Sequence, residues 1–342
     1  MKIVISGKAF VKKYRTGVQR YCIELLDEID VQAKEIEIEL LVPQYCDEKF
    51  NYKNIKIVKF GNLNLNLWEQ IELPLYVKKE NAIVVNLCNT SPLLNPGIVC
   101  IHDLDCIKNP QYYPKLFSIW YKIIIDNAIK KAKRIITVSN FSKKEIENFY
   151  NIDNVEVIYN SYEHINRIDE DDKIFEKLPK LLNNEYYFTL GTVQKNKNIE
   201  WILNIAKRNL DKTFVITGYK NQKNIKFDLK NVIYTGYLED GEIKSLMKNC
   251  KAYIMPSFYE GFGLPPLEAF ALGKCVIASD IPVMNEIFED EIKYLRPDNY
   301  DINLDELICS KNREKILRKF SWKNSANKFM KVVYNLEKEN FK

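Results

Sequence analysis

The chain has no Cys-x-x-Cys pair and only two histidines among its 342 residues. Zinc sites usually need closely spaced cysteines or histidines, so a zinc-dependent protein is not expected. Eight cysteines occur singly, and those next to apolar runs, such as Cys88, Cys100 and Cys275, are interpreted as small buried hydrophobic residues. Scattered cysteines of this kind favour a reducing cytoplasm, which is the predicted location.

Long apolar runs are also lacking. No stretch of about 18 apolar residues occurs, so no membrane-spanning helix is expected. Residues 1–10 begin with a short strand pattern, and no secretion signal is expected from them. The net charge of +5 is mild, and no nucleic-acid-binding motif accompanies it. Nucleic acid is therefore not an expected partner.

Basic residues are nevertheless unevenly distributed. A first cluster contains Lys8, Lys12, Lys13, Arg15 and Arg20, with no acidic residue among them. A second cluster spans residues 130–134. Each is either an ordinary solvated face or a surface that attracts an anionic membrane or a diphosphate-bearing acceptor.

The alternation of strand and helix patterns occurs twice along the chain, which predicts two α/β domains with parallel sheets. An apolar content of 46% supports two large cores. We expect a first domain over residues 1–165 and a second over 166–321. The final helix, within 322–342, is expected to return to the first domain.

The most informative stretch is residues 259–268, which reads Tyr-Glu-Gly-Phe-Gly-Leu-Pro-Pro-Leu-Glu. Proline is tolerated in the first turn of a helix, so Pro265 and Pro266 predict that a helix starts here. Glu260 then lies in the preceding loop and Glu268 in the first turns. The glycines allow the backbone to approach a ligand closely.

This stretch offers two kinds of contact. Unpaired N–H groups at a helix start attract anions such as phosphate, here through the amides of Gly263 and Leu264. Two carboxylates accept hydrogen bonds from paired hydroxyls of a sugar or a ribose. The alternative interpretation is an ordinary capped helix, with Glu268 in solvent.

These residues resemble the Glu-x7-Glu segment of the retaining glycosyltransferases of family 4. Further matching segments follow the family's order along the chain. They are Arg15 to Tyr21, His102-Asp103, residues 135–142 (Ile-Ile-Thr-Val-Ser-Asn-Phe-Ser), and Gly191-Thr192 followed by Lys197-Asn198. The resemblance covers most of the chain. It implies the GT-B fold, in which two Rossmann-like, doubly wound parallel-sheet domains face an interdomain cleft.

The resemblance also implies roles for individual residues. Glu268 would bind the ribose hydroxyls, Glu260 the transferred sugar, and Lys197 the diphosphate. Many relatives carry an additional arginine near this lysine. This chain has Thr192 and Asn196 at those positions, so fewer positively charged side chains are expected around the diphosphate.

Other residues complete the expected donor site. The base would pack around Tyr237 and Leu238, with Tyr219 at its border, although aromatic residues after strands often belong to a core. The remaining donor-binding candidates are Gly17, Gly191, Thr192, Gly261, Phe262, Gly263 and Leu264.

His102 follows a predicted buried strand, and the resemblance implies that it hydrogen-bonds the sugar. His102, Glu260 and Lys197 are therefore the candidate catalytic residues. Asp103-Leu104-Asp105 is formally a D-x-D motif, which in another transferase fold holds Mg²⁺ or Mn²⁺. Because it precedes the second domain, we interpret Asp103 as support for the His102 loop. No metal or other cofactor is expected.

Lys12, Lys13, Arg15 and Asp103 are the predicted acceptor-side residues. Residues 7–20 are expected to form a charged loop at the mouth of the cleft, because the segment has few apolar residues to bury. If the acceptor is a lipid diphosphate, this loop would attract it and the membrane surface. Otherwise it is a solvated loop.

The sequence therefore predicts a retaining hexosyltransferase of class EC 2.4. It would move a sugar from a UDP-, GDP- or dTDP-sugar to a hydroxyl of a growing, bacterial-type surface polysaccharide or lipid-linked oligosaccharide. Its predicted location is the cytoplasm or the inner face of the cell membrane. The alternatives are a nucleotide-sugar epimerase of similar fold and a non-catalytic subunit that binds glycan or nucleotide. The sugar, the nucleotide, the acceptor and the oligomeric state stay open.

Overall fold

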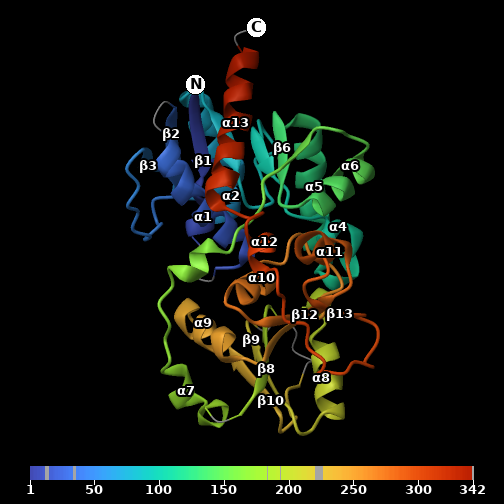
Figure 1. The fold of residues 1–342 in the computed structure, drawn as a ribbon. Helices are drawn as coiled ribbons and strands as arrows, with labels where there is room; N and C mark the ends of the chain where they lie inside the picture. The colour runs from blue at the N-terminus through green and yellow to red at the C-terminus, as the bar shows by residue number, and fades with distance from the viewer. Residues whose placement is uncertain (12–14, 34–35, 183, 193, 220–225, 341–342) are drawn as a thin grey trace. The chain divides into compact units, whose positions relative to one another are not determined.

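The computed structural model describes residues 1–11, 15–33, 36–182, 184–192, 194–219 and 226–340. The chain divides into two units (Figure 1). Unit 1 comprises Met1–Asn160 and Phe320–Lys342, and unit 2 comprises Ser161–Lys319. The first division therefore falls after residue 160, whereas the sequence predicted one after 165. This difference places His164 in unit 2.

Unit 1 contains a sheet of seven parallel strands in the order β3-β2-β1-β4-β5-β6-β7. The strands are β1 (Lys2–Ser6), β2 (Glu37–Val42), β3 (Ile55–Lys59), β4 (Ile83–Asn86), β5 (Ile98–Cys100), β6 (Arg134–Thr137) and β7 (Val155–Val157). Strand β1 pairs with both β2 and β4, so the chain direction across the sheet reverses there. Open parallel sheets bind ligands beyond the carboxyl ends of strands at such a reversal.

Helices cover this sheet. They are α1 (Gly17–Gln32), α2 (Leu65–Leu67), α3 (Leu73–Lys79), α4 (Asp105–Lys108), α5 (Lys115–Lys131), α6 (Asn140–Tyr150) and α13 (Trp322–Asn340). Helix α1 starts with a capping box, in which the backbone N–H of Thr16 donates to Gln19 at 3.0 Å. As predicted, the last helix belongs to the first unit, and α13 packs against α1.

One helical run of unit 1 changes its pitch. Helix α2 continues through a π-helical turn, Trp68–Glu72, into α3, and we call the whole run helix 65–79. The N–H of Leu73 bonds to the carbonyl of Trp68, five residues back. Pro74 follows at the start of α3 and has no N–H to donate, so the wider turn lies next to the missing bond.

Unit 2 contains a sheet of six parallel strands in the order β10-β9-β8-β11-β12-β13. Its strands are β8 (Tyr186–Leu190), β9 (Thr213–Thr217), β10 (Val232–Gly236), β11 (Ala252–Met255), β12 (Cys275–Ser279) and β13 (Lys293–Leu295). Its helices are α7 (Ile174–Lys177), α8 (Ile199–Arg208), α9 (Asp240–Asn249), α10 (Leu264–Ala271), α11 (Pro282–Phe288) and α12 (Arg313–Leu317). The direction reverses between β8 and β11.

The sequence patterns do not indicate a few short elements: β3, β13, α4, α11 and α12. Strand β3 lies at the edge of its sheet and is only partly buried, so its residues do not show a clear apolar pattern. Residues 163–181 form two short 3₁₀ turns with the four-residue helix α7 between them. No described helix is both long and apolar enough to cross a membrane.

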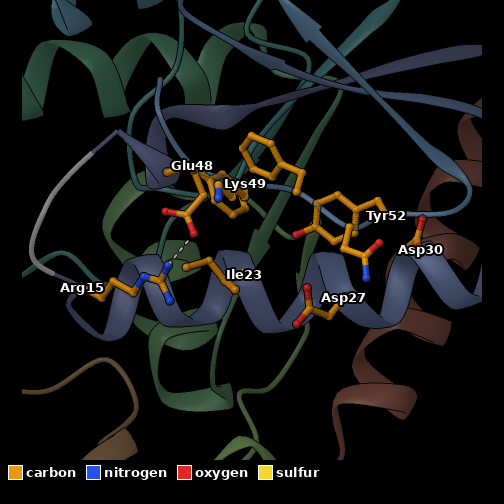
Figure 2. Close-up of a pocket in the computed structure, with 10 residues that line it drawn as sticks. Arg15, Ile23, Asp27, Asp30, Glu48, Lys49 and Tyr52 are labelled. Atoms are coloured by element: carbon orange, nitrogen blue, oxygen red, sulfur yellow. Dashed lines mark hydrogen bonds and ion pairs between the residues drawn. The ribbon is translucent and has the colours of Figure 1, made fainter. Parts of the chain in front are cut away.

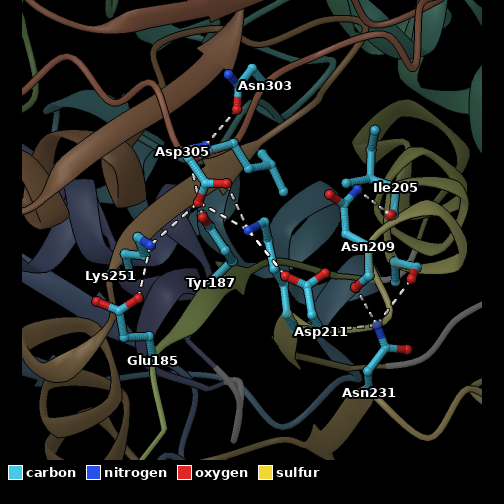
Figure 3. A network of polar contacts seen from close by, with 12 residues as sticks. Glu185, Tyr187, Ile205, Asn209, Asp211, Asn231, Lys251, Asn303 and Asp305 are labelled. Carbon is cyan, nitrogen blue, oxygen red and sulfur yellow. Dashed lines mark hydrogen bonds and ion pairs between the residues drawn. The ribbon is translucent and has the colours of Figure 1, made fainter.

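Charged residues stand immediately before three neighbouring strands of unit 2 (Figure 3). The Nζ of Lys212 lies 2.9 Å from both carboxylate oxygens of Asp305. The Nζ of Lys251 lies 2.8 Å from Glu185 and 3.6 Å from Asp305. Both carboxylates are largely in solvent, so each pair contributes little to stability. The network joins the amino ends of the strands, at the edge opposite the loops that carry Lys197.

Cys275 and Cys309 form a disulfide, with their Cα atoms 4.7 Å apart. The interpretation of Cys275 as a simple buried hydrophobic residue is therefore wrong. A separation of 34 residues gives no local signal, because only the fold brings the two thiols together. The cytoplasmic location, which was argued from single cysteines, stays a prediction.

The packing of α13 leads to a test of unit 1. Phe329 is fully buried on this helix. Phe329→Ala should lower the free energy of unfolding by about 3–5 kcal/mol, because it leaves a cavity in the core. Lys331→Ala, on the exposed side of the same helix, should change it by less than about 0.5 kcal/mol. Chemical denaturation of the two variants measures this difference, and equal effects would contradict the packing.

Candidate active site

In unit 2, two predicted site residues meet beyond the carboxyl ends of β8 and β11. Lys197 lies in the 3₁₀ turn Lys195–Lys197, before α8, and Glu260 lies in the loop after β11. The Nζ of Lys197 is 2.6 Å from Oε1 of Glu260. The lysine side chain is 29% exposed and the glutamate 11%, so the pair lies at the surface of the unit. A cation and a carboxylate are thus held side by side where the sheet reverses.

Backbone and amide contacts hold these two loops together. Asn198 adopts a left-handed conformation, with φ of 51°. Its Nδ2 donates to the carbonyl of Pro256 at 3.1 Å and to that of Pro297 at 2.8 Å. The N–H of Phe258 donates to the carbonyl of Asn196 at 2.8 Å. Lys197 lies between these two tethered asparagines, so its position relative to Glu260 is fixed.

The start of α10 requires a glycine at 263. Gly263 has φ of +96°, and a Cβ there would lie 2.3 Å from Cε of Met284. The helix begins at Leu264, as the two prolines predicted. Because Pro265 and Pro266 have no N–H groups, the predicted anion contact at this helix start is limited to the amides of residues 263 and 264.

Glu268 lies on the second turn of α10 and is buried. Nε2 of His164 donates to Oε1 of Glu268 at 2.7 Å. Sequence reasoning missed His164, because 104 residues separate the pair and no motif surrounds the histidine. The alternative of a solvated Glu268 is wrong, because the carboxylate is 8% exposed and fixed by an imidazole.

Glycines at the carboxyl ends of β8, β9 and β10 allow close contacts between the backbones there. The N–H of Gly191 bonds to the carbonyl of Thr217, and the N–H of Gly218 to that of Gly236. A Cβ on Gly218 would lie 2.0 Å from the carbonyl oxygen of Gly191, so the two backbones approach more closely than a side chain permits. The predicted residue Thr192 continues directly from Gly191.

Among the residues predicted to border the base, the two tyrosines are exposed and Leu238 is buried. Tyr219 follows β9 and is 54% exposed, whereas Tyr237 follows β10 and is 37% exposed. Neither ring belongs to the core, so both are accessible for stacking. Leu238 is buried, and so is Phe262, one of the other donor-binding candidates.

In unit 1, His102 follows β5 and is buried. Its Nε2 lies 2.9 Å from the carbonyl of Leu87, and its backbone N–H donates to Oδ1 of Asn89 at 2.6 Å. The ring also makes an edge-to-face contact with Tyr21, with centroids 5.0 Å apart. The residue is therefore held by the loop after β4, which is the strand next to β5.

Burial lowers the pKa of His102 from 6.5 to about 4, although the hydrogen bond to the Leu87 carbonyl opposes this shift. The imidazole is therefore neutral near pH 7. Because Nε2 carries the proton that bonds to the carbonyl, Nδ1 is the acceptor nitrogen. A neutral ring of this kind is suited to hydrogen bonding and not to proton donation at neutral pH.

The Ser-Asn-Phe-Ser motif supports the same loop. Oγ of Ser139 caps α6 by accepting from the N–H of Ser142 at 2.9 Å. Oγ of Ser142 in turn donates to the carbonyl of His102 at 2.8 Å. Ser139 is therefore the cap of α6, and Ser142 holds the backbone of His102.

The D-x-D motif has structural contacts. Oδ1 of Asp103 accepts from the backbone N–H of Asp105 at 2.9 Å. The two carboxylate oxygens of Asp105 accept from Asn109 at 2.7 Å and from Tyr113 at 2.6 Å. Among the described residues, no three His, Cys, Asp or Glu side chains are grouped so that they can hold a metal ion. The predicted independence of metal stays a prediction.

Lys8 does not belong to a solvent-facing loop. Its Nζ lies 2.8 Å from Oε2 of Glu69 and 2.8 Å from Oγ1 of Thr90, and the side chain is 13% exposed. Gly7–Phe10 forms a largely buried 3₁₀ turn, and α1 starts at Gly17. The expectation of a charged loop over 7–20 is therefore wrong at both ends, because the first end is a largely buried turn and the last residues belong to a helix.

The other predicted acceptor-side cations are only partly described. Nη2 of Arg15 lies 2.9 Å from Oε1 of Glu48. Lys12 and Lys13 lie outside the described residues. The role of these residues toward an acceptor or a membrane stays a prediction.

A cavity of about 350 Å³ extends along α1 (Figure 2). Its lining includes Phe10, Arg15, Ile23, Asp27, Asp30, Glu48, Lys49, Phe50, Asn51 and Tyr52. The carboxylate of Asp30 accepts from the backbone N–H groups of residues 53–55, so this acid fixes the loop wall. The pair Arg15–Glu48 closes one end of the lining.

The state of His102 leads to a spectroscopic test. The chain contains two histidines, so ¹⁵N-labelled imidazole signals are assigned by comparison with His164→Gln. We expect His102 to stay neutral down to a pKa of about 4, with the proton on Nε2. Titration by two-dimensional NMR measures both properties. A midpoint near the ordinary value of about 6.5 would show that the ring is accessible to water.

The sequence was compared with protein families and with curated proteins. The model described as Glycosyltransferase Family 4 matches residues 15–164, and that described as Glycosyl transferases group 1 matches residues 170–318. The O-antigen chain mannosyltransferase RfbU of Salmonella typhimurium is 30% identical, over 84% of this chain and 85% of its own length. O-antigen chain mannosyltransferase B of Escherichia coli is 25% identical, over 61% of this chain and 59% of its own length.

Solved structures show the same architecture. Sucrose-phosphate synthase of Thermosynechococcus elongatus matches with a TM-score of 0.76 and 14% identity, over 99% of this chain and 100% of its own. HepE of Anabaena, solved with UDP and glucose, matches with a TM-score of 0.74 and 16% identity, over 98% and 100%. Because two family models together span nearly the whole chain and the Salmonella enzyme is 30% identical, the chain belongs to the glycosyltransferases of family 4 and group 1, with the GT-B fold.

Proposed function

We propose that this glycosyltransferase transfers a hexose, with retention, from a nucleotide sugar to a hydroxyl of a growing surface polysaccharide. The observation that carries the proposal is the ion pair between Lys197 and Glu260 at the reversal point of the unit 2 sheet. Two relatives are named O-antigen chain mannosyltransferases, which supports mannose as the sugar and a lipopolysaccharide-type glycan as the acceptor.

The pair suits a ligand that has both an anion and hydroxyls. When a nucleotide sugar binds, phosphate oxygens replace Glu260 as the partner of Lys197. The released carboxylate of Glu260 then accepts hydrogen bonds from sugar hydroxyls. As the bond between C1 of the sugar and the phosphate oxygen breaks, negative charge grows on the diphosphate. In this scheme, Lys197 and the amides of residues 263 and 264 stabilise that negative charge, which lowers the barrier to transfer.

The nucleoside would occupy the neighbouring part of the same edge. Glu268 binds the ribose hydroxyls, and His164 keeps its carboxylate in one orientation. The base stacks near Tyr237 and Tyr219. HepE of Anabaena was solved with UDP, which supports a nucleoside diphosphate as the ligand class, and GDP and dTDP fit the same contacts.

Retention follows from reaction on one face of the sugar. The hydroxyl of the acceptor attacks C1 from the side that the diphosphate leaves, and its proton passes to a leaving phosphate oxygen. The products are the extended glycan and the nucleoside diphosphate. The neutral ring of His102 hydrogen-bonds the sugar during this step. No metal is needed in this scheme, because Lys197 and backbone amides neutralise the phosphate.

On the acceptor side, Arg15 and Asp103, with Lys12 and Lys13, remain the proposed contacts. A cytoplasmic location at the inner face of the membrane accords with acceptors of this class.

The proposed reaction is tested with pooled UDP-, GDP- and dTDP-sugars and a lipid-linked glycan acceptor. Mass spectrometry should detect addition of one hexose, and NMR of the product should show the donor's anomeric configuration. Glu260→Ala should lower turnover by about a hundredfold or more, because it removes a contact to the reacting sugar. Activity should survive EDTA.

The matched control is Glu200→Ala, which removes an exposed carboxylate at the start of α8 and should leave turnover unchanged. Unchanged turnover of Glu260→Ala at saturating donor would refute the role of Glu260. Epimerised nucleotide sugar without an extended glycan would support the epimerase alternative. Loss of activity in EDTA with rescue by Mg²⁺ or Mn²⁺ would restore the metal role of the D-x-D motif.

Lys197→Ala should weaken binding of the nucleoside diphosphate by about tenfold to a hundredfold and leave binding of the free nucleoside nearly unchanged. A hydrogen bond to a charged group contributes about 1.5–3 kcal/mol, and the nucleoside has no phosphate partner for the lysine. Calorimetry with both ligands measures the difference.

Two further variants are compared with Lys197→Ala in the same measurement. His164→Ala should weaken nucleoside and diphosphate alike, because it frees the carboxylate that binds ribose. Lys207→Ala, an exposed lysine near the end of α8, should affect neither. Equal losses of both ligands in Lys197→Ala would place this lysine away from the phosphate.

A further inference from the structure

Helix α5 is apolar on two sides, and only one side is covered. Residues such as Ile125 and Ala128 pack in the core with β5 and β6. On the other side, Leu116 is 82% exposed and Ile119 is 57% exposed. The exposed large apolar residues of α5 are Leu116, Phe117, Ile119, Trp120 and Ile123. Spacings of three, four and seven residues place most of them on one face of the helix.

Helix 65–79 presents a similar stripe. Leu67, Ile71 and Leu75 recur every four residues, and Leu75 is 58% exposed. Both helices belong to connections that cross the sheet in the same direction, from β3 to β4 and from β5 to β6. Because such crossovers are right-handed, the two helices lie on the same face of the sheet.

The loop after β4 joins the two stripes. Nε2 of Gln70, on helix 65–79, donates to the carbonyl of Ser91, and the N–H of Leu93 donates to Oε1 of Gln70, both at 3.0 Å. Nδ2 of Asn127, on α5, donates to the carbonyl of Leu93 at 3.0 Å. Leu94, next in this loop, is 69% exposed. We call these nine exposed side chains the apolar face: Leu67, Ile71, Leu75, Leu94, Leu116, Phe117, Ile119, Trp120 and Ile123.

The charges that accompany the apolar face are mostly positive. Helix α5 carries four lysines and one acid, Asp126, which pairs with Lys122 at 2.6 Å. Lys130 follows Ile123 by seven residues and therefore lies on the same side of α5, and both Lys130 and Lys131 are exposed. Helix 65–79 ends in two further exposed lysines, Lys78 and Lys79. The surface is complementary to negative charge.

We propose that the apolar face docks on an anionic phospholipid bilayer, with α5 and helix 65–79 lying in the headgroup region. Apolar residues flanked by lysines are typical of helices that bind in the plane of a membrane. Trp120 is suited to the boundary between headgroups and acyl chains. Lysine is depleted in protein–protein interfaces, which disfavours a second protein as the occupant. This docking does not depend on which sugar or nucleotide the enzyme uses.

Trp120 reports directly on this contact. The chain has four tryptophans, and Trp68, Trp201 and Trp322 are at most 1% exposed, whereas Trp120 is 36% exposed. Vesicles of phosphatidylcholine and phosphatidylglycerol, with bromine on the acyl chains, should quench its fluorescence. Trp120→Phe should abolish the quenching. Added salt should weaken binding, because it screens the lysines from the lipid charge.

Variants of exposed residues separate docking from folding and activity. Ile119→Ser with Ile123→Ser should lower vesicle affinity by about tenfold or more, because burial of these apolar side chains in the bilayer favours binding. Leu182→Ser with Leu210→Ser, two exposed leucines of unit 2, is the matched control and should bind like the wild type. Transfer to a soluble acceptor should be the same in both double variants.

The lysines are tested in the same way. Lys130→Gln with Lys131→Gln should lower binding to phosphatidylglycerol vesicles, whereas Lys207→Gln with Lys230→Gln should not. Absence of quenching in the wild type, or wild-type affinity in the Ile119 and Ile123 double variant, would overturn the proposal. So would a dimer, seen by light scattering, that this double variant dissociates, because the apolar face would then bind a second copy of the chain.

Discussion

In a parallel sheet, the loops that follow the strands all lie at the same edge, and the candidate site depends on this constraint. In unit 2 the reversal between β8 and β11 separates two such loops at that edge. The amide of Asn198 then ties them through the carbonyl of Pro256, and a second bond to the carbonyl of Pro297 ties the first loop to the one after β13. Without these bonds, Lys197 and Glu260 would be two surface charges on separate loops. With them, they form one cation–carboxylate pair.

The contact between Lys197 and Glu260 also balances their charges within the protein. An unpaired charge that is largely removed from water is costly, and the ion pair avoids this cost for both side chains. In the proposed reaction, a nucleotide sugar supplies a phosphate for Lys197 and hydroxyls for Glu260, so neither group loses its partner on binding. Lys8 and Glu69 in unit 1 show the opposite case. Their pair is more deeply buried and is joined by Thr90, which makes it part of the framework.

The two histidines illustrate what motif reasoning can find. His102 follows a strand and precedes an aspartate, so its sequence context pointed to it, and the structure adds its neutral state and tautomer. His164 has no such context, because no motif surrounds it in the sequence. Its function of fixing Glu268 arises only when α10 packs beside that segment. The same limit applied to Cys275 and Cys309, whose bond joins distant segments.

The sequence by itself determined the architecture, because apolar periodicity specifies strands and helices locally, and their alternation allows few arrangements other than two parallel sheets. It also determined the start of α10, since Gly263 and the two prolines restrict the backbone directly. Only the tertiary structure decided which charged side chains form ion pairs. The basic segment 7–20 contains no acid, yet Lys8 and Arg15 each meet a carboxylate from elsewhere in the chain. It also decided which apolar residues stay exposed on α5, because helical periodicity identifies a face but not what packs against it.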